Sequence, residues 1–105
     1  DYLDQVTLVR HESFAAFEGW RALKRVSLVL LTTTAEQSYL DHTFGIDQIL
    51  MFGRESAGVP DVVHRAADTR VCVPMRPGMR SINVAMAVAM VVGEALRQTG
   101  GLPQQ

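Results

Sequence analysis

The segment 76–83 concentrates charged, hydroxyl and amide side chains in one short loop. Its sequence is Arg76-Pro77-Gly78-Met79-Arg80-Ser81-Ile82-Asn83, and it joins the apolar run 71–73 to the apolar stretch 84–92. A strand, a tight loop and a helix N-terminus often form a ligand site in α/β proteins. The helix end contributes free N–H groups and a partial positive charge. The segment therefore predicts a ligand-binding loop at the start of a helix.

Several side chains of this loop and of a second one, Gly53-Arg54-Glu55, fit more than one role. Gly53 lacks a side chain, so its backbone can approach a ligand closely. The Glu55 carboxylate can brace loop N–H groups or act in a site through the same bonds. Ser81 can cap the final helix and still serve a site, whereas Asn83 needs hydrogen-bond partners if it is buried.

The arginines of segment 76–83 also fit more than one role. Arg76 and Arg80 flank a glycine and could hold phosphate groups. Ordinary solvated loop charges would give the same pattern. The sequence alone does not choose between them.

Alternating strands and helices are expected to position these loops. Apolar and β-branched runs predict strands at 6–9, 26–31, 49–52 and 71–73. A first helix is expected after Ser13, with Phe14, Phe17 and Leu23 on its inner face. A second is expected within 59–67, with Pro60 in its first turn. A third is expected over 82–98, ending before Gly100 and Gly101. The alternation predicts a three-layer α/β fold with a mostly parallel sheet. Because parallel strands end at one edge, the polar loops should meet there.

The final helix is unusual because residues 84–92 are apolar on every side. A helix at the surface normally carries a polar face. Two explanations remain open. Either the helix is wrapped by its own domain, or a second copy of the chain covers its outer side in a homodimer.

Composition limits the class of protein. The chain has 105 residues, enough for one domain, and its net charge of −1 gives no overall nucleic-acid footprint. The only cysteine, Cys72, lies in an apolar run, which predicts a packing role and a reducing compartment such as the cytoplasm. No apolar run approaches the ~20 residues that span a bilayer. His11, His42 and His64 lack metal-ligand spacing, so no metal is expected.

Two motifs together resemble a known family. The stretch 52–60, Phe-Gly-Arg-Glu-Ser-Ala-Gly-Val-Pro, is similar to motif 2 of the SPOUT RNA methyltransferases. Residues 73–83, followed by the apolar helix and Glu94-Ala95-Leu96, are similar to motif 3. The resemblance is strongest to the TrmL-type branch, which methylates the ribose 2′-hydroxyl of the tRNA wobble nucleotide. It covers essentially the whole chain.

The resemblance implies a C-terminal trefoil knot, S-adenosylmethionine as methyl donor, and a homodimer formed through helix 82–98. Carried over by position, the family's cofactor contacts fall on Leu31, Gly53, Val73 and Ser81. The candidate catalytic residues are Glu55, Ser81 and Asn83. The candidate RNA contacts are Arg54, which replaces a common proline, with Arg76 and Arg80. Gly93 stands where an aromatic residue is common, which affects the expected dimer packing.

The family's motif 1, with its catalytic arginine, would lie upstream of Asp1. Residues 1–105 are therefore expected to be the C-terminal two-thirds of a single, N-terminally truncated SPOUT domain. The implied function is methylation of the wobble ribose of tRNA. The alternatives are methylation of ribosomal RNA or of another tRNA position, or a cofactor-binding and dimerising module without turnover.

Overall fold

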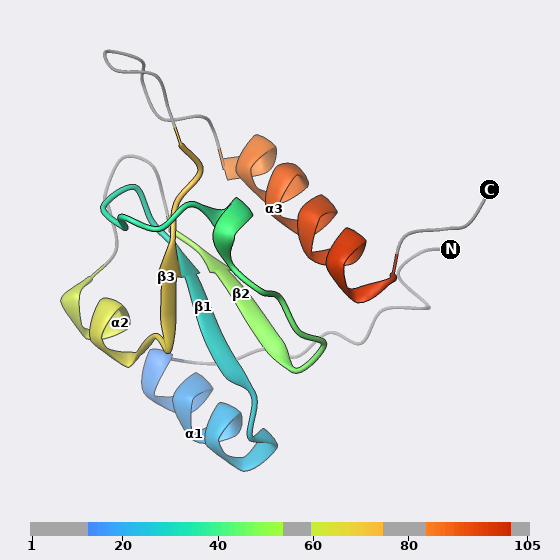
Figure 1. Cartoon of the computed structure of the whole chain (residues 1–105). Coiled ribbons are helices and arrows are strands. Elements are labelled where there is room, and N and C mark those ends of the chain that lie inside the picture. Colours follow the sequence, from blue (N-terminus) through green and yellow to red (C-terminus); the bar gives the residue numbers. More distant parts are fainter. Residues whose placement is uncertain (1–12, 54–59, 75–83, 102–105) are drawn as a thin grey trace.

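A three-stranded parallel sheet forms the centre of the molecule. The computed structural model describes residues 13–53, 60–74 and 84–101. Within them the elements are helix α1 (Phe14–Lys24), strand β1 (Ser27–Leu31), 3-10 helix η2 (Tyr39–Asp41), strand β2 (Gln48–Phe52), helix α2 (Asp61–Ala66), strand β3 (Thr69–Val71) and helix α3 (Val84–Thr99). The strand order is β2-β1-β3, and both pairings are parallel (Figure 1). This confirms the predicted α/β class with a parallel sheet.

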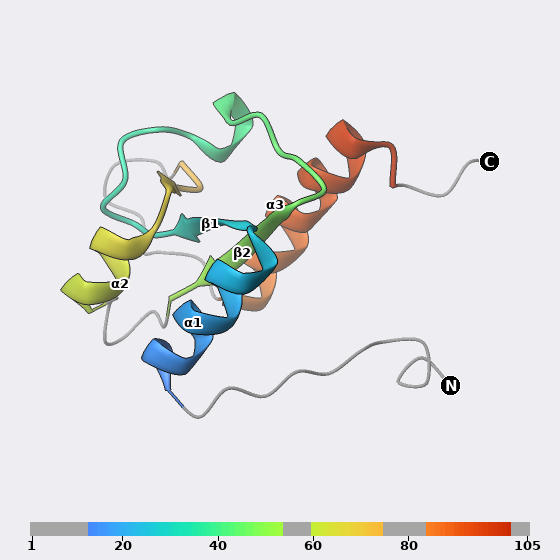
Figure 2. The ribbon, with the colours of Figure 1, turned by 90° about the horizontal axis from the view of Figure 1, so that it is seen from below.

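Helices cover both faces of the sheet, and the central strand β1 is apolar on both. Leu28 and Leu30 are fully buried in a cluster with α1 and α2, where they meet Val63 and Phe17. The alternate side chains of β1 belong to a second cluster, on the face covered by α3. Figure 2 shows α3 on one side of the sheet and α1 and α2 on the other. The predicted three-layer arrangement is therefore present in the described residues.

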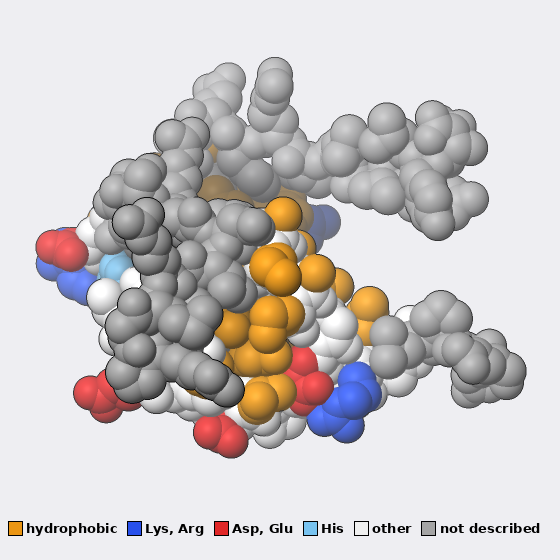
Figure 3. Space-filling view, turned by 90° about the horizontal axis from the view of Figure 1, so that it is seen from above, with side chains coloured by type: hydrophobic (Ala, Val, Ile, Leu, Met, Phe, Trp, Pro, Cys, Tyr) orange, Lys and Arg blue, Asp and Glu red, His pale blue; other side chains and the backbone are white. Residues whose placement is uncertain are grey.

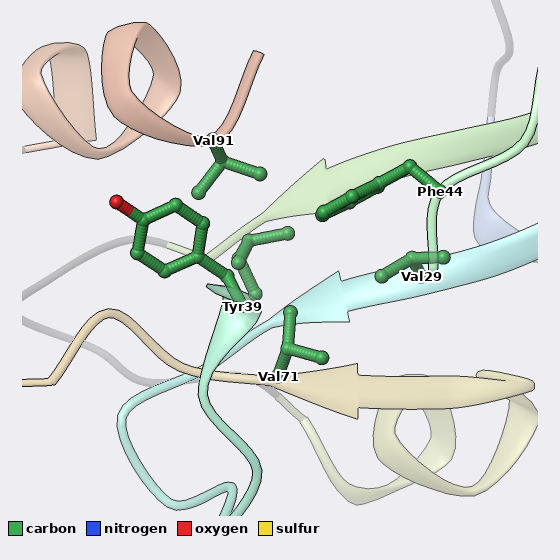
Figure 4. Packing of buried hydrophobic residues seen from close by; sticks show 6 residues of the cluster. Val29, Tyr39, Phe44, Val71 and Val91 are labelled. Carbon is green, nitrogen blue, oxygen red and sulfur yellow. The ribbon is translucent and has the colours of Figure 1, made fainter. Parts of the chain in front are cut away.

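The connection between β1 and β2 contributes two aromatic side chains to the cluster beneath α3. Tyr39 and Phe44, from the chain between β1 and β2, are 7% and 6% exposed and lie with Val91 of α3 over the sheet. Figure 4 shows their rings grouped with Val91 above Val29 and Val71. Through these two side chains the connection contributes to the core, while much of the rest of it is exposed.

Helix α1 begins as predicted but turns a different face inward. The Ser13 hydroxyl accepts a hydrogen bond from the N–H of Ala16 at 3.0 Å, which confirms the N-cap. Leu23, expected on the inner face, is 85% exposed, and this expectation was wrong. The inward row is Phe14, Phe17 and Arg21, spaced by three and four residues, and Leu23 lies off that row.

Two other boundaries differ from the sequence prediction. The strand expected at 71–73 lies at Thr69–Val71, because its pairing with β1 ends where Leu31 meets Val71. Cys72 forms only an isolated bridge to Ser38, and its side chain is half-buried rather than buried inside a strand. Pro60 is the N-cap of α2 rather than a residue of its first turn, and its carbonyl accepts from the N–H of His64 at 3.2 Å. The strand expected at 6–9 lies outside the described residues.

The final helix ends where the glycines predict. Helix α3 runs to Thr99, and Gly100 has a φ of 77°, a left-handed conformation that glycine adopts without steric cost. The N–H of Gly101 then bonds to the carbonyl of Leu96 at 2.8 Å, which closes the helix end. Its first predicted residues, Ile82 and Asn83, and the expected cap Ser81 lie outside the described residues.

The Asp68 carboxylate extends the pairing of β1 and β3 by one residue, ahead of the first pair, Val29 with Thr69. The Asp68 carboxylate accepts from the N–H of Leu28 at 2.7 Å, and the Asp68 N–H donates to the Leu28 carbonyl at 2.9 Å. The same oxygen meets the guanidinium of Arg21 at 2.8 Å. Arg21 also bonds to Glu18 and to the carbonyl of Ala66, so it joins α1 to the connection between α2 and β3. The N–H of Leu28 and the guanidinium of Arg21 lower the pKa of Asp68.

We expect Asp68→Ala to lower the free energy of unfolding by about 1–3 kcal/mol, because the N–H of the fully buried Leu28 loses its partner. The pKa of Asp68 is lower in the folded protein than its usual value of 3.8, so the ionic contribution is complete above that value. It is lost as the pH falls through the folded pKa. Urea unfolding at several pH values should therefore show a difference from the parent protein that shrinks in acid. Glu36→Ala, which removes an exposed carboxylate, is the control; an equal effect of both variants would contradict the prediction.

Candidate functional site

Three of the predicted cofactor residues meet at the carboxyl edge of the sheet. Leu31 is the last residue of β1 and pairs with Phe52 of β2 and Val71 of β3, so the three strands end level with one another. Gly53 directly follows β2 and is half-buried, and Val73 is the second residue after β3. Leu31 and Val73 belong to the same apolar cluster. The structure therefore brings Leu31, Gly53 and Val73 to one edge.

Backbone hydrogen bonds hold this edge in a defined shape. The N–H of Thr32 donates to the carbonyl of Val71 at 2.9 Å, which extends the β1–β3 ladder past the last strand residue. The chain after Thr32 then turns, and its carbonyl accepts from the N–H of Ala35 at 3.4 Å. Further on, the N–H of Cys72 donates to Gln37 at 2.9 Å, and the N–H of Tyr39 donates to Cys72 at 2.8 Å. The crossover chain is thus attached to the exit of β3.

Tyr39 is a residue of this region that the sequence prediction missed. It is 7% exposed, and its ring lies in the cluster that contains Leu31 and Val71 (Figure 4). Its position depends on the backbone bond to Cys72, a partner far away in sequence. The connection also contains Leu40, Phe44 and Ile46, of which Leu40 and Ile46 are exposed, so an apolar side chain there does not by itself indicate burial.

The other predicted site residues fall on two segments that begin or end at this edge. Segment 54–59 starts directly after Gly53, and segment 75–83 joins Pro74 to the first residue of α3. Both lie outside the described residues. They carry the predicted site residues Arg54, Glu55, Arg76, Arg80, Ser81 and Asn83.

A hollow of about 510 Å³ lies beside β3, away from the three residues at the carboxyl edge. It is lined by residues 34–37 and 68–70, and it opens widely to solvent. Its lining includes Glu36 and Asp68 together with Arg70. The Arg70 guanidinium donates at 2.7 Å to the carbonyl of His64 at the end of α2. The charges of this hollow are mixed, and it does not coincide with the predicted cofactor residues.

His42 and His64 have ordinary surroundings. His42 lies within hydrogen-bonding distance of the Gln48 side chain, 3.2 Å, and its ring meets Phe44 edge to face at 4.6 Å. His64 offers its backbone carbonyl to Arg70. Among the described residues, no group of three or more histidine, cysteine or acidic side chains could hold a metal ion.

Helix α3 presents an apolar side to solvent. Ala85, Met86, Ala89 and Met90 are exposed, with Met86 at 57% and Met90 at 41%. The opposite side of the helix carries Val91, which is fully buried. Figure 3 shows apolar side chains running along this helix toward an acidic and a basic group. No helix in the described parts of the chain is long and apolar enough to cross a bilayer.

Known proteins with the same features were found by sequence and by structure. Residues 1–93 match the family model described as the SpoU rRNA methylase family. The chain is 62% identical over 102 residues to the tRNA (cytidine(34)-2'-O)-methyltransferase of Beijerinckia indica, an alignment that covers 97% of this chain and 64% of the relative. The chain thus spans less than two thirds of that relative's length.

Two solved structures share the fold. One, solved to study 2-OH methylation of C/U34 on tRNA, is 36% identical with a TM-score of 0.82, over 97% of this chain and 66% of the other. The SpoU methyltransferase AviRb from Streptomyces viridochromogenes, in complex with AdoMet, is 26% identical with a TM-score of 0.82, over 90% of this chain and 39% of the other. These similarities confirm the resemblance to the SPOUT methyltransferases, and the chain belongs to the SpoU rRNA methylase family.

Proposed function

We propose that this chain is part of a methyltransferase that uses S-adenosylmethionine to methylate the ribose 2′-hydroxyl of nucleotide 34 in tRNA. The observation that carries the proposal is the meeting of Leu31, Gly53 and Val73 at one edge of a sheet. The 62% identity to a tRNA (cytidine(34)-2'-O)-methyltransferase supports the choice of substrate. A cytoplasmic enzyme would be consistent with a tRNA substrate.

The residues at the carboxyl edge fit an adenosine-containing cofactor. Leu31 and the half-buried Phe52 and Val73 belong to one apolar cluster, which offers a surface for an aromatic base. Gly53 has no side chain, so a ligand can approach its backbone. Main-chain N–H and carbonyl groups after each strand can then bond to the base edges and the ribose.

When bound, S-adenosylmethionine supplies an electrophilic methyl group on a sulfonium. The protein must then align a weakly nucleophilic ribose hydroxyl with that methyl group and assist the loss of its proton. We assign this alignment to Ser81 and Asn83, and we assign Glu55 to bracing the loop or facing the ribose. Arg54, Arg76 and Arg80 would hold RNA phosphates, because guanidinium groups bind phosphate oxygens well.

Two architectural features belong to the same proposal. Segment 75–83 would thread through the connection after β1 or β2 to make a trefoil knot. The exposed apolar side of α3 would pack against a second copy of the chain, since Ala89 and Met90 lie there beside the small residue Gly93. Small residues allow two helices to approach closely, which supports a homodimer as the occupant of this side.

The proposal predicts binding of S-adenosylhomocysteine, the reaction product, to the folded chain. Isothermal titration calorimetry should give saturable binding, and folded protein without any binding would contradict the cofactor assignment. Methyl transfer to total tRNA, followed by nucleoside mapping, should place the product at the ribose of position 34, as named for the relative. A product elsewhere in tRNA or in ribosomal RNA would favour the first alternative. Binding without turnover would favour a cofactor-binding module, in agreement with the share of the relative that this chain spans.

A further inference from the structure

The C-terminal half of α3 carries a hydrogen-bonded group that the proposed chemistry does not use. Gln98 lies on the side of the helix that faces the sheet, seven residues after the fully buried Val91 and three after the half-buried Ala95. It is half-buried and ends an otherwise apolar row. A polar side chain in that position requires polar partners.

Those partners are the backbone of the connection that leads into β2. The Gln98 amide oxygen accepts from the N–H of Phe44 at 2.7 Å. Its amide nitrogen donates to the carbonyl of His42 at 2.9 Å. A backbone N–H only donates and a carbonyl only accepts, so this pair fixes the orientation of the amide. Gln98 thus attaches α3 to the chain at 42–44 through two directional bonds.

Two neighbours on the helix hold the Gln98 side chain in place. The Glu94 carboxylate accepts from the second amide hydrogen of Gln98 at 2.9 Å. Arg97 pairs with both oxygens of Glu94, at 2.8 and 2.7 Å. The hydrogen bonds from Arg97 and Gln98 lower the pKa of Glu94 to about 2, so this carboxylate is charged at neutral pH. The Glu94 carboxylate that orients Gln98 therefore stays a hydrogen-bond acceptor at neutral pH.

The connection at residues 42–44, to which Gln98 is hydrogen-bonded, is itself attached to the sheet. The Gln48 side chain, at the start of β2, accepts from the N–H of Gly45 at 3.1 Å and lies 3.2 Å from the His42 ring. The N–H of Ser27, at the start of β1, donates to the carbonyl of Asp47 at 3.2 Å. Gln98 therefore links α3 to the frame of the strands rather than to a freely moving loop.

Apolar packing alone leaves the axial position of α3 weakly specified. Within the described part of α3, Val91 is the only fully buried side chain, and hydrophobic contact is not directional. Val91 and the half-buried Ala95 pack in the apolar cluster that contains Leu31 and Val73. A shift or rotation of α3 would therefore disturb the packing of Leu31 and Val73 at the carboxyl edge.

We propose that Gln98, held by Glu94 and Arg97, is a positioning residue that fixes α3 against the apolar cluster of Leu31 and Val73 at the proposed cofactor edge of the sheet. The expected effect on cofactor binding rests on the proposed function. The role of Gln98 in fixing the position of α3 does not. We assign Gln98 no contact with the cofactor or the RNA. It acts through the helix.

The test compares Gln98→Met, which keeps the length and removes the amide bonds, with Val63→Ala on α2. Val63 is buried on the opposite face of the sheet, so its variant loses stability without touching α3. Under conditions where every variant is fully folded, Gln98→Met should weaken S-adenosylhomocysteine binding by about 5-fold, in the range seen for residues that act on a site without contacting the ligand. It should also speed hydrogen exchange in the first turns of α3. Val63→Ala should leave the affinity unchanged and should speed exchange no more in the first turns of α3 than elsewhere in the core.

A rescue separates positioning from general destabilisation. Gln98→Glu alone places two carboxylates side by side and should weaken binding further than Gln98→Met. Adding Glu94→Gln restores an amide-to-carboxylate bond at that point and should recover part of the affinity. Wild-type affinity and wild-type exchange in folded Gln98→Met would overturn the inference. If the parent protein binds no S-adenosylhomocysteine, the proposed function fails, and exchange at the start of α3 still decides whether Gln98 positions the helix.

Discussion

Gly53→Val is expected to weaken binding of S-adenosylhomocysteine by ~100-fold or more, equivalent to about 2.7 kcal/mol. Gly53 lies directly after β2, at the edge where Leu31 and Val73 also lie. A valine side chain there would occupy space that a ligand needs in order to reach the backbone. The measurement is calorimetric titration of folded protein, with the fold checked by circular dichroism.

The matched control is Gly19→Val, the same chemical change in α1. A side chain at Gly19 would meet no atom within 4 Å, and α1 covers the sheet away from the proposed cofactor edge. Its cofactor affinity should equal that of the parent protein, and the helix should tolerate the change because valine has a higher helix propensity than glycine. Unchanged affinity in folded Gly53→Val would remove Gly53 from the site.

Leu30→Ala should have the largest effect on stability, about 2–5 kcal/mol. Leu30 is fully buried in the central strand and packs in the cluster that contains Val63 and Ala67. Removing its branched end leaves a cavity between the sheet and the layer of α1 and α2. Since a domain of this kind is stable by ~5–15 kcal/mol, the variant should show a much lower urea midpoint.

Leu23→Ala provides the comparison, because the same atoms are removed from a side chain that is 85% exposed. We expect a change within about 0.5 kcal/mol. The contrast tests the observed orientation of α1 directly, since the sequence pattern had predicted Leu23 to be buried. A large loss from Leu23→Ala, or a small one from Leu30→Ala, would contradict the layer arrangement.

Local patterns predicted the elements that depend on local physics. The run 26–31, apolar except for Ser27, predicted a strand buried on both faces, and Leu28 and Val29 are both fully buried. The hydroxyl of Ser13 and the missing side chain of Gly100 set the ends of α1 and α3 as expected. Parallel pairing predicted that the strands would end at one edge of the sheet. Leu31, Gly53 and Val73 lie at that edge, as predicted.

Features that depend on distant partners could not be predicted in this way. The partly buried position of Arg21 on α1 is matched by Asp68, which lies far along the chain and pairs with it. Leu23 is a different case, because the helix repeat alone places it off the row of Phe14 and Phe17. Gln98 looked like the polar end of a helix until the backbone at Phe44 was placed against it. The threading of segment 75–83 stays a prediction for the same reason, because a knot is a property of the whole path.

The central position of β1 has a consequence for how the chain is made. β1 pairs with β2 and β3, yet both partners follow it in the sequence, β3 by about forty residues. At a synthesis rate of ~5–20 residues per second, β3 emerges from the ribosome on the order of 2–8 seconds after β1. During that interval a strand that is apolar on both faces has no complete sheet to join. The nascent chain should therefore expose this apolar strand until β3 has emerged.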